Sequence, residues 1–210
     1  MIVKVCGMRE ARNIREVEQL GIDWMGFIFW PHSSRYVAER PDYLPARTKR
    51  VGVFVDADVS EVAARGRDYA LDVVQLHGRE TAAYVKALRA AWQQPQQPVI
   101  VKALNIATAA DLEQTAAYAD GIDYFLFDTK GKIVGGNGVK FDWSVLDHYA
   151  GPTPFLLSGG IGPDDADRVN AFQHPLLAGI DLNSRFEQAP ALKDVGLLRT
   201  FLSSIQLSER

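Results

Sequence analysis

The chain begins Met1-Ile2-Val3-Lys4-Val5-Cys6-Gly7-Met8-Arg9-Glu10, and this stretch decides between two candidate folds. Its apolar run, Ile2–Cys6, is typical of a buried strand, and a helical pattern follows over Asn13–Gln19. An open, doubly wound sheet would be expected to carry a G-x-G-x-x-G turn after its first strand. No such turn follows Cys6. The start of the chain therefore favours the other parallel arrangement, a closed barrel.

The same alternation of strand and helix continues along the chain. Apolar runs that are nearly continuous predict strands covered on both faces, without paired hairpins. The predicted strands are Ile2–Cys6, Trp24–Phe29, Arg50–Val55, Val73–His77, Val99–Leu104, Tyr124–Asp128, Pro154–Ser158 and Ala178–Leu182. The predicted helices are Asn13–Gln19, Val59–Tyr69, Thr81–Ala91, Ala109–Ala117, Trp143–Tyr149, Asp164–Phe172 and Leu192–Ile205. In place of a second helix, the prolines of Arg40–Pro45 leave room for little more than a turn. This pattern predicts an α/β protein, a single-domain (β/α)8 TIM barrel over residues 1–210.

Composition excludes several classes of function. A formal net charge of −3 and the absence of basic runs give no electrostatic reason to bind nucleic acid or an anionic membrane. The first residues form too short an apolar stretch for a signal peptide, and nothing approaches a membrane-spanning run. The one cysteine, Cys6, cannot form an internal disulfide. We therefore expect a cytoplasmic protein with no nucleic-acid or membrane partner.

In a barrel of this kind the active site lies at the carboxyl ends of the strands. Cys6 ends the first predicted strand, so its thiol is a candidate general base. A thiol there is expected to lie near the N-terminus of the first helix, whose partial positive charge favours the thiolate. Strand alternation places Lys4 on the same face, as a second source of positive potential. The alternative is that Cys6 is a small buried apolar residue.

Asp128 ends the apolar strand Tyr124–Asp128 and is a candidate acid. A carboxylate that loses water is costly to ionise, so its pKa should rise and it can donate a proton. The alternatives are a helix cap, or an ion pair with Lys130 or Lys102. The next predicted helix starts well downstream, which argues against the cap.

A phosphate site is predicted after the last two strands. Gly159 and Gly160 follow the seventh strand and allow backbone N–H groups to approach an anion. Asn183 and Ser184 follow the eighth strand and add hydrogen-bond donors beside a helix start. Asp181, near the end of that strand, is a further candidate for binding the substrate. The alternative is a pair of ordinary tight turns.

Three further features lie on the predicted rim. The glycine-rich loop Lys130–Lys140 does not have P-loop spacing and is interpreted as a lid over Asp128, or else as a plain connection. Arg35 could hold a substrate carboxylate through two parallel hydrogen bonds, although surface arginines are common. His77 ends the fourth strand and is predicted to orient substrate or to make one structural hydrogen bond. The histidines are scattered without metal-ligand spacing, so no metal site is expected.

Taken in order, these segments resemble the phosphoribosylanthranilate isomerase family over essentially the whole chain. The matching segments are Lys4–Gly7, Ser34–Val37, Val74–Gly78, Phe127–Thr129, Gly135–Gly138, Phe141–Trp143, Ser158–Ile161, Gly179–Ser184, Glu187, Pro190 and Lys193–Asp194.

The resemblance implies an enzyme of tryptophan biosynthesis that works without a cofactor. The implied reaction is an Amadori rearrangement of N-(5-phosphoribosyl)anthranilate to 1-(2-carboxyphenylamino)-1-deoxyribulose 5-phosphate. Asp128 matches the general acid, Cys6 the general base, and Arg35 the residue that holds the anthranilate carboxylate. The seventh and eighth loops match the phosphate site. We expect a monomer or homodimer whose partner is this small substrate.

Four rival functions remain open from sequence. An indole-glycerol-phosphate synthase would use an inward lysine acid, for which Lys102 is the candidate. A metal-dependent epimerase would need converging ligands, and a non-enzymatic binding barrel would have no use for Cys6 and Asp128. A dual-specificity histidine and tryptophan isomerase would need a second phosphate site. Three carboxylates near the third and fourth strand ends, Asp56, Asp58 and Glu80, are expected to repel a second phosphate.

Overall fold

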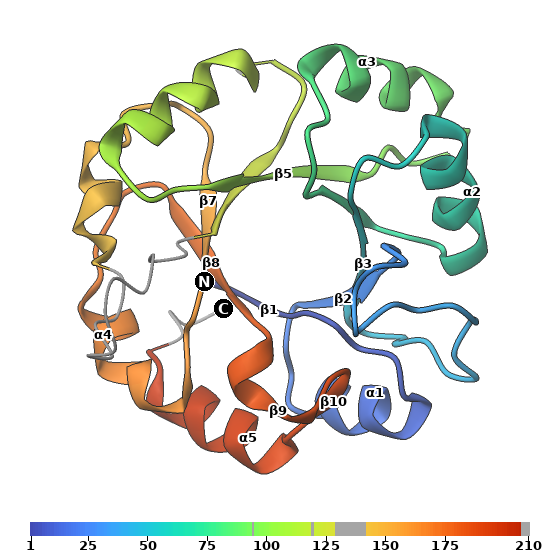
Figure 1. Ribbon diagram of the computed structural model, residues 1–210. Helices are drawn as coiled ribbons and strands as arrows, with labels where there is room; N and C mark the ends of the chain where they lie inside the picture. Colours follow the sequence, from blue (N-terminus) through green and yellow to red (C-terminus); the bar gives the residue numbers. More distant parts are fainter. Residues whose placement is uncertain (94, 119, 129–141, 207–210) are drawn as a thin grey trace.

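The computed structural model describes residues 1–93, 95–118, 120–128 and 142–206. Eight parallel strands close into a barrel in chain order, with the helices outside it (Figure 1). The predicted fold class is therefore confirmed. The strands are β1 (Ile2–Val5), β2 (Trp24–Ile28), β3 (Lys49–Phe54), β4 (Val73–Leu76), β5 (Val99–Asn105), β6 (Tyr124–Asp128), β7 (Phe155–Ser158) and β8 (Leu177–Leu182).

Each strand packs on both of its faces, which explains the continuous apolar runs. On β5, Val101 and Ala103 belong to a cluster inside the barrel, whereas Ile100 and Leu104 belong to the cluster between strands and helices. The ring closes where β1 pairs with β8, with Lys4 opposite Asp181. This register brings the carboxyl ends of all eight strands to one face of the barrel.

The helices follow the predicted order, and several begin at a polar cap. They are α1 (Ala11–Glu18), α2 (Val59–Tyr69), α3 (Ala82–Ala91), α4 (Ala166–Ala171), α5 (Val195–Ser204) and the 3-10 helices η1 (Ala109–Tyr118), η2 (Trp143–His148), η3 (Pro163–Asp165) and η4 (Ser184–Phe186). Thr81 caps α3 by accepting a hydrogen bond from the Tyr84 N–H. Residues 29–48 are fully described and contain no helix, as the two prolines of Arg40–Pro45 predict. Glu18 anchors this segment by accepting hydrogen bonds from the N–H groups of Ala46 and Arg47.

The last helix begins later than predicted. Residues 192–205 were expected to be helical, but Leu192 and Lys193 form β10, which pairs antiparallel with β9 (Glu187–Ala189). Asp194 then caps α5, because its Oδ1 accepts a hydrogen bond from the Leu197 N–H at 2.9 Å. The resulting β9–β10 hairpin, residues 187–193, lies beside α1 and α5 (Figure 1). It brings Glu187 and Lys193 to the carboxyl ends of the strands.

Candidate active site

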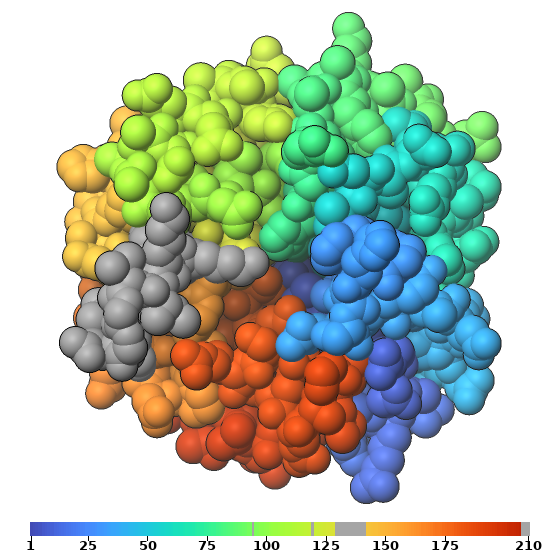
Figure 2. All heavy atoms as spheres, viewed as in Figure 1, coloured from blue at the N-terminus to red at the C-terminus, as the bar shows by residue number. Residues whose placement is uncertain are grey.

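A cavity of about 330 Å³ opens at the carboxyl ends of the strands. Figure 2 shows this face, with a depression near its centre between the blue segment after β2 and the orange-red segment after β8. A larger hollow, of about 740 Å³, lies between α1 and the β9–β10 hairpin, and its lining includes none of the residues predicted for the site. The strand-end cavity is lined by all nine residues predicted for the site: Cys6, Arg35, His77, Asp128, Gly159, Gly160, Asp181, Asn183 and Ser184.

Cys6 follows β1 directly and faces the inside of the barrel. Its side chain packs in the inner cluster with Trp24 and Val51, and the residue is 3% exposed. Its N–H donates to the Leu182 carbonyl at 2.9 Å, which extends the β1–β8 ladder by one residue. Room for the thiol comes from Gly26 on β2, where a Cβ atom would lie only 2.7 Å from Cys6 Sγ. The position of the thiol thus depends on a glycine of the neighbouring strand.

The electrostatics of Cys6 differ from the sequence-based prediction. Burial raises the pKa of the Cys6 thiol, and Asp181 raises it further, while Lys4 and Lys193 pull it down without reversing the shift. The helix that was expected to favour the thiolate begins only at Ala11, so its N-terminus is not adjacent. Lys4 does lie on the same face, but its Nζ pairs with Asp181 Oδ1 at 2.8 Å, and that carboxylate offsets its charge.

Asp128 ends β6 on the opposite wall, three strands from β1 in the ring. It shares the inward face of β6 with Leu126 and is 5% exposed. His77, at the end of β4, approaches it with Nε2 3.7 Å from Asp128 Oδ2. The structure therefore brings a thiol and a carboxyl group to facing walls of one cavity, with an imidazole beside the carboxyl group.

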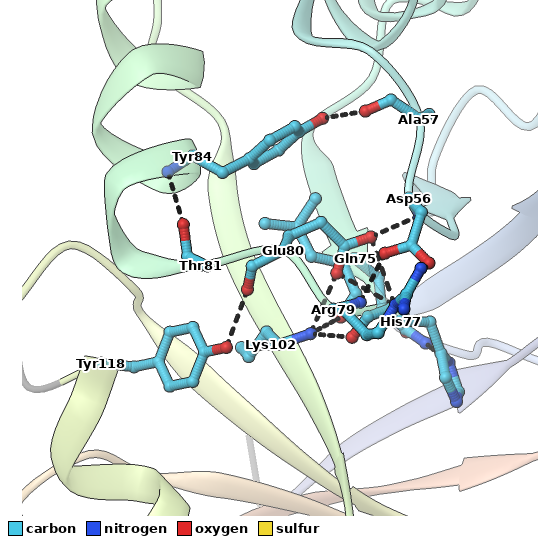
Figure 3. Close-up of polar contacts among 12 residues, drawn as sticks. Asp56, Ala57, Gln75, His77, Arg79, Glu80, Thr81, Tyr84, Lys102 and Tyr118 are labelled. Atoms are coloured by element: carbon cyan, nitrogen blue, oxygen red, sulfur yellow. Dashed lines mark hydrogen bonds and ion pairs between the residues drawn. The ribbon is translucent and has the colours of Figure 1, made fainter.

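Gln75 fixes the orientation of the His77 ring, because it contacts the ring nitrogen that does not face Asp128 (Figure 3). The amide Nε2 of Gln75 lies 2.9 Å from His77 Nδ1. If that amide donates, His77 carries its own proton on Nε2, which is the nitrogen facing Asp128. Gln75 is buried, and its Oε1 has no hydrogen-bond partner among the described residues. Sequence reasoning missed Gln75, although it lies two residues before His77 and so shares its face of the strand.

Lys102 does not face the cavity, so the rival indole-glycerol-phosphate synthase function loses its candidate for an inward lysine acid. It alternates with the inward Val101 and Ala103, and it points into the layer between strands and helices. There its Nζ donates to Glu80 Oε2 at 2.9 Å and to the Gly78 carbonyl at 2.6 Å (Figure 3). Lys102 is therefore not paired with Asp128. The buried Lys102–Glu80 pair instead fixes the backbone that follows His77.

The seventh and eighth loops lie together on the far side of the cavity. Gly159 and Gly160 have φ angles of 96° and 74°, a backbone region that favours glycine. A Cβ atom on Gly162 would lie 3.5 Å from Arg185 Cβ, so the two loops are in contact. Asp181 accepts a hydrogen bond from Ser158 Oγ at 3.4 Å. The phosphate role of these loops stays a prediction.

Arg35 makes its two parallel hydrogen bonds to a carboxylate of the chain itself. Its Nε lies 2.8 Å from Glu187 Oε1, and its Nη2 lies 2.6 Å from Glu187 Oε2. Glu187 Oε1 also accepts from Lys193 Nζ at 2.5 Å, and the same ammonium donates to Asn183 Oδ1 at 2.8 Å. Burial opposes ionisation of Glu187, but Arg35 and Lys193 outweigh it and lower the pKa of the carboxyl group. Sequence reasoning recorded Glu187 and Lys193 only as matching positions and gave them no role.

Some predictions concern residues that the structure leaves undescribed. The proposed lid, residues 130–140, lies outside the described residues, and so does Lys130 as a partner of Asp128. Within the described ranges, no group of three or more His, Cys, Asp or Glu side chains is arranged to hold a metal ion. Within the same ranges, no helix is long and apolar enough to span a membrane.

A closed eight-stranded barrel whose strand ends enclose a thiol, a carboxyl group, a glycine turn after β7 and a polar loop after β8 defines the class: a (β/α)8-barrel enzyme. A family model described as N-(5′-phosphoribosyl)anthranilate (PRA) isomerase matches residues 3–204. The chain therefore belongs to the N-(5′-phosphoribosyl)anthranilate isomerase family.

Individual relatives agree with this membership. The N-(5′-phosphoribosyl)anthranilate isomerase of Phocaeicola vulgatus is 47% identical over 206 residues, which are 98% of each chain. The crystal structure of phosphoribosyl anthranilate isomerase from Thermotoga maritima superposes with a TM-score of 0.79 at 28% identity, covering 97% of this chain and 98% of that one. Another solved structure, with a TM-score of 0.77 and 26% identity over the same shares, contains reduced 1-(o-carboxyphenylamino)-1-deoxyribulose 5-phosphate.

Proposed function

We propose that this chain catalyses the Amadori rearrangement of N-(5′-phosphoribosyl)anthranilate to 1-(2-carboxyphenylamino)-1-deoxyribulose 5-phosphate, a step of tryptophan biosynthesis. The observation that carries the proposal is a thiol and a carboxyl group on facing walls of one cavity in a member of this family. The relative that holds the reduced product analogue supports the same substrate class.

Asp128 is the general acid in this proposal. Its carboxyl group protonates the ribose ring oxygen, the bond from C1′ to that oxygen breaks, and the nitrogen lone pair forms a Schiff base. A carboxylate then remains in a site where Asp128 is 5% exposed. The His77 Nε2, 3.7 Å from Asp128 Oδ2, is placed to stabilise that charge.

Cys6 is the general base on the facing wall. Its thiolate takes the C2′ proton, and the electron pair of that bond moves toward the Schiff-base nitrogen to give an enolamine. The enolamine tautomerises to the 1-deoxyribulose ketone. Asp128 gives one proton to the substrate and Cys6 takes one from it, so the substrate is isomerised with no net gain or loss of protons. The roles therefore require an acid and a base on opposite sides of the sugar.

Arg35 and the last two loops hold the ends of the substrate. Glu187 binds Nε and Nη2 of Arg35, whereas Nη1 makes no hydrogen bond within the described part of the chain. Arg35 also lines the cavity, so its remaining N–H groups suit the anthranilate carboxylate. The backbone of Gly159 and Gly160, with Asn183 and Ser184 opposite, suits the phosphate at the other end.

A substrate with phosphate at both ends is a poor match for the β3 and β4 ends. The N–H groups of Asp56 and Gly78 donate to the Glu80 carboxylate, and the Arg79 N–H donates to Asp56 Oδ1 at 2.6 Å (Figure 3). The donors that a second phosphate would need are therefore occupied by carboxylates of the chain. The sequence predicted that three carboxylates, Glu80 among them, would repel a second phosphate. Glu80 faces Lys102 and not the mouth, so this prediction is corrected: the chain's own carboxylates compete with a second phosphate for the same N–H donors.

The cellular setting follows from the same proposal. We infer a cytoplasmic enzyme that is a monomer or a homodimer and takes no nucleic acid, which the net charge of −3 supports. A solved relative from Thermotoga maritima is described as dimeric. Light scattering behind a sizing column would measure the mass, and a mass above two chains would contradict this inference.

The test of function is a turnover assay with three substrates. Purified protein is incubated with phosphoribosylanthranilate, with the bisphosphate substrate of the histidine-pathway isomerase, and with carboxyphenylaminodeoxyribulose phosphate. Loss of phosphoribosylanthranilate fluorescence with formation of the ketone is expected, with little turnover of the bisphosphate and no indole-glycerol phosphate. Comparable kcat/KM on both isomerase substrates would mean a dual-specificity enzyme. No turnover of phosphoribosylanthranilate would refute the proposal.

A further inference from the structure

Two buried ion pairs lie on either side of Cys6. On the side of the barrel interior, Lys4 pairs with Asp181 at 2.8 Å. On the side of the mouth, Lys193 pairs with Glu187, whose carboxylate also binds Arg35. The first pair has no net charge, whereas the cluster of Arg35, Glu187 and Lys193 carries a net charge of +1 when all three groups are ionised.

Lys193 is buried in an unusual place for a lysine. Its side chain is 0% exposed, yet it belongs to a two-residue strand on the hairpin that follows β8. Its Nζ donates to Glu187 and to Asn183, and a Cβ atom on Gly7 would lie 3.5 Å from that Nζ. The ammonium group therefore lies against the backbone of the residue that follows Cys6.

We propose that Lys193 and Glu187 are positioning residues for the reaction: Lys193 supplies positive charge beside the ionised thiol of Cys6, and Glu187 limits that charge while holding Arg35 at the cavity. The inference rests on the proposed function, because it assigns a purpose to the thiolate and to Arg35. Neither side chain lines the strand-end cavity. Both therefore act through Cys6 and Arg35, without contact with the reacting atoms.

The charged groups around the Cys6 thiol belong to four different segments of the chain. Lys4 lies on β1, Asp181 on β8, and Lys193 on β10, while Arg35 reaches in from the segment after β2. Burial raises the pKa of the Cys6 thiol, and Lys193 is one of the two ammonium groups that lower it. Removing Lys193 should make the thiol harder to ionise, and removing the charge of Glu187 should make it easier.

The test reads the thiol directly, because Cys6 is the one cysteine in the chain. The rate of alkylation by iodoacetamide is followed by mass spectrometry as a function of pH, without substrate, and the midpoint of the profile is compared between variants. Lys193→Met is expected to raise the midpoint by about one pH unit, a fall of ~10-fold in rate at a fixed pH below it. Glu187→Gln is expected to lower the midpoint by a similar amount.

The double variant separates charge from packing. With Lys193→Met and Glu187→Gln combined, Arg35 alone again gives the cluster a charge of +1, so the midpoint should return close to that of the wild type. Lys193→Arg should also retain the wild-type midpoint. If Lys193→Met is too unstable to purify, Glu187→Gln and the double variant carry the test, since neither leaves a carboxylate without its lysine.

Matched controls and kinetics complete the design. Lys86→Met on α3 and Glu113→Gln on η1 remove the same charges at exposed positions and should leave the midpoint unchanged. Glu187→Gln should also raise KM for phosphoribosylanthranilate, because Arg35 loses its partner. A shift in the same direction for both single variants, or no shift in either, would overturn the inference. Because the midpoint is measured without substrate, this outcome is distinct from a failure of the wild type to turn over.

Discussion

Replacing Lys102 tests whether this lysine supports the site or performs chemistry. The side chains of Lys102 and Glu80 are each 1% exposed, and their charged atoms lie 2.9 Å apart. Lys102→Met keeps the length of the apolar stem but leaves the Glu80 carboxylate buried without its counter-charge. Breaking such a pair by removing one partner costs about 3–5 kcal/mol of folding free energy. The N–H groups of Asp56 and Gly78 still bind Glu80, which favours the lower end, about 3 kcal/mol.

The measurements are urea unfolding, thermal unfolding and steady-state kinetics. For a domain of this length, a loss of about 3 kcal/mol corresponds to a fall in Tm of roughly 10 °C. At a temperature where the variant is folded, kcat should stay within about fivefold of the wild type, because Lys102 points away from the cavity. Lys86→Met, exposed on α3, should change stability by no more than about 0.5 kcal/mol. A variant of normal stability with kcat abolished would refute this reasoning and restore Lys102 as a catalytic acid.

Other substitutions give separate tests. Asp128→Asn should lower kcat by at least ~10² with unfolding by urea unchanged, since an amide cannot donate the proton that opens the ring; full activity would place the acid elsewhere. Arg35→Ala should raise KM about 10- to 100-fold through loss of a charge-assisted contact worth ~1.5–3 kcal/mol, and an unchanged KM would remove it from substrate binding. Gly26→Ala should cost about 1–3 kcal/mol of stability, because its Cβ would lie 2.7 Å from Cys6 Sγ, and calorimetry would detect this. The pKa of Glu187 is lowered in the folded chain, so the ionised carboxylate stabilises the fold above the ordinary glutamate pKa. This contribution to the free energy of unfolding is lost as pH falls below about 4. Acid unfolding of Glu187→Gln should therefore depend less on pH in that range than acid unfolding of the wild type.

The sequence predicts the barrel well because its signals are local. A strand covered on both faces has a continuous apolar run, and all eight predicted strands overlap the observed ones. The prolines Pro41 and Pro45 correctly indicate that no helix fills the connection after β2. The start of the last helix is less evident, because the apolar spacing runs on through Leu192, whereas the cap at Asp194 sets the true boundary.

The site is predicted less completely, for reasons that particular residues make clear. Cys6 and Asp128 could be placed because each ends an apolar run. Lys102 could not, because Ile100 and Val101 are equally apolar, and a strand buried on both faces does not reveal which residues point inward. The link from Arg35 to Glu187 spans 152 positions and depends on how the barrel closes. The raised pKa of Cys6 depends on burial, which no local pattern reports.

The central claim is that the Cys6 thiolate is the base, and the pH dependence of kcat/KM for phosphoribosylanthranilate tests it most directly. This profile reports the ionisation of groups in the free enzyme. Because the active form needs Asp128 protonated and Cys6 ionised at once, we predict a bell-shaped profile of kcat/KM for the wild type. One limb of this profile should have its midpoint above the ordinary thiol pKa and equal to the alkylation midpoint of Cys6. Cys6→Ala should lose this limb and retain at most ~1% of the activity. A limb with the same midpoint in Cys6→Ala, or near-normal turnover by that variant, would contradict the assignment of Cys6 as the base.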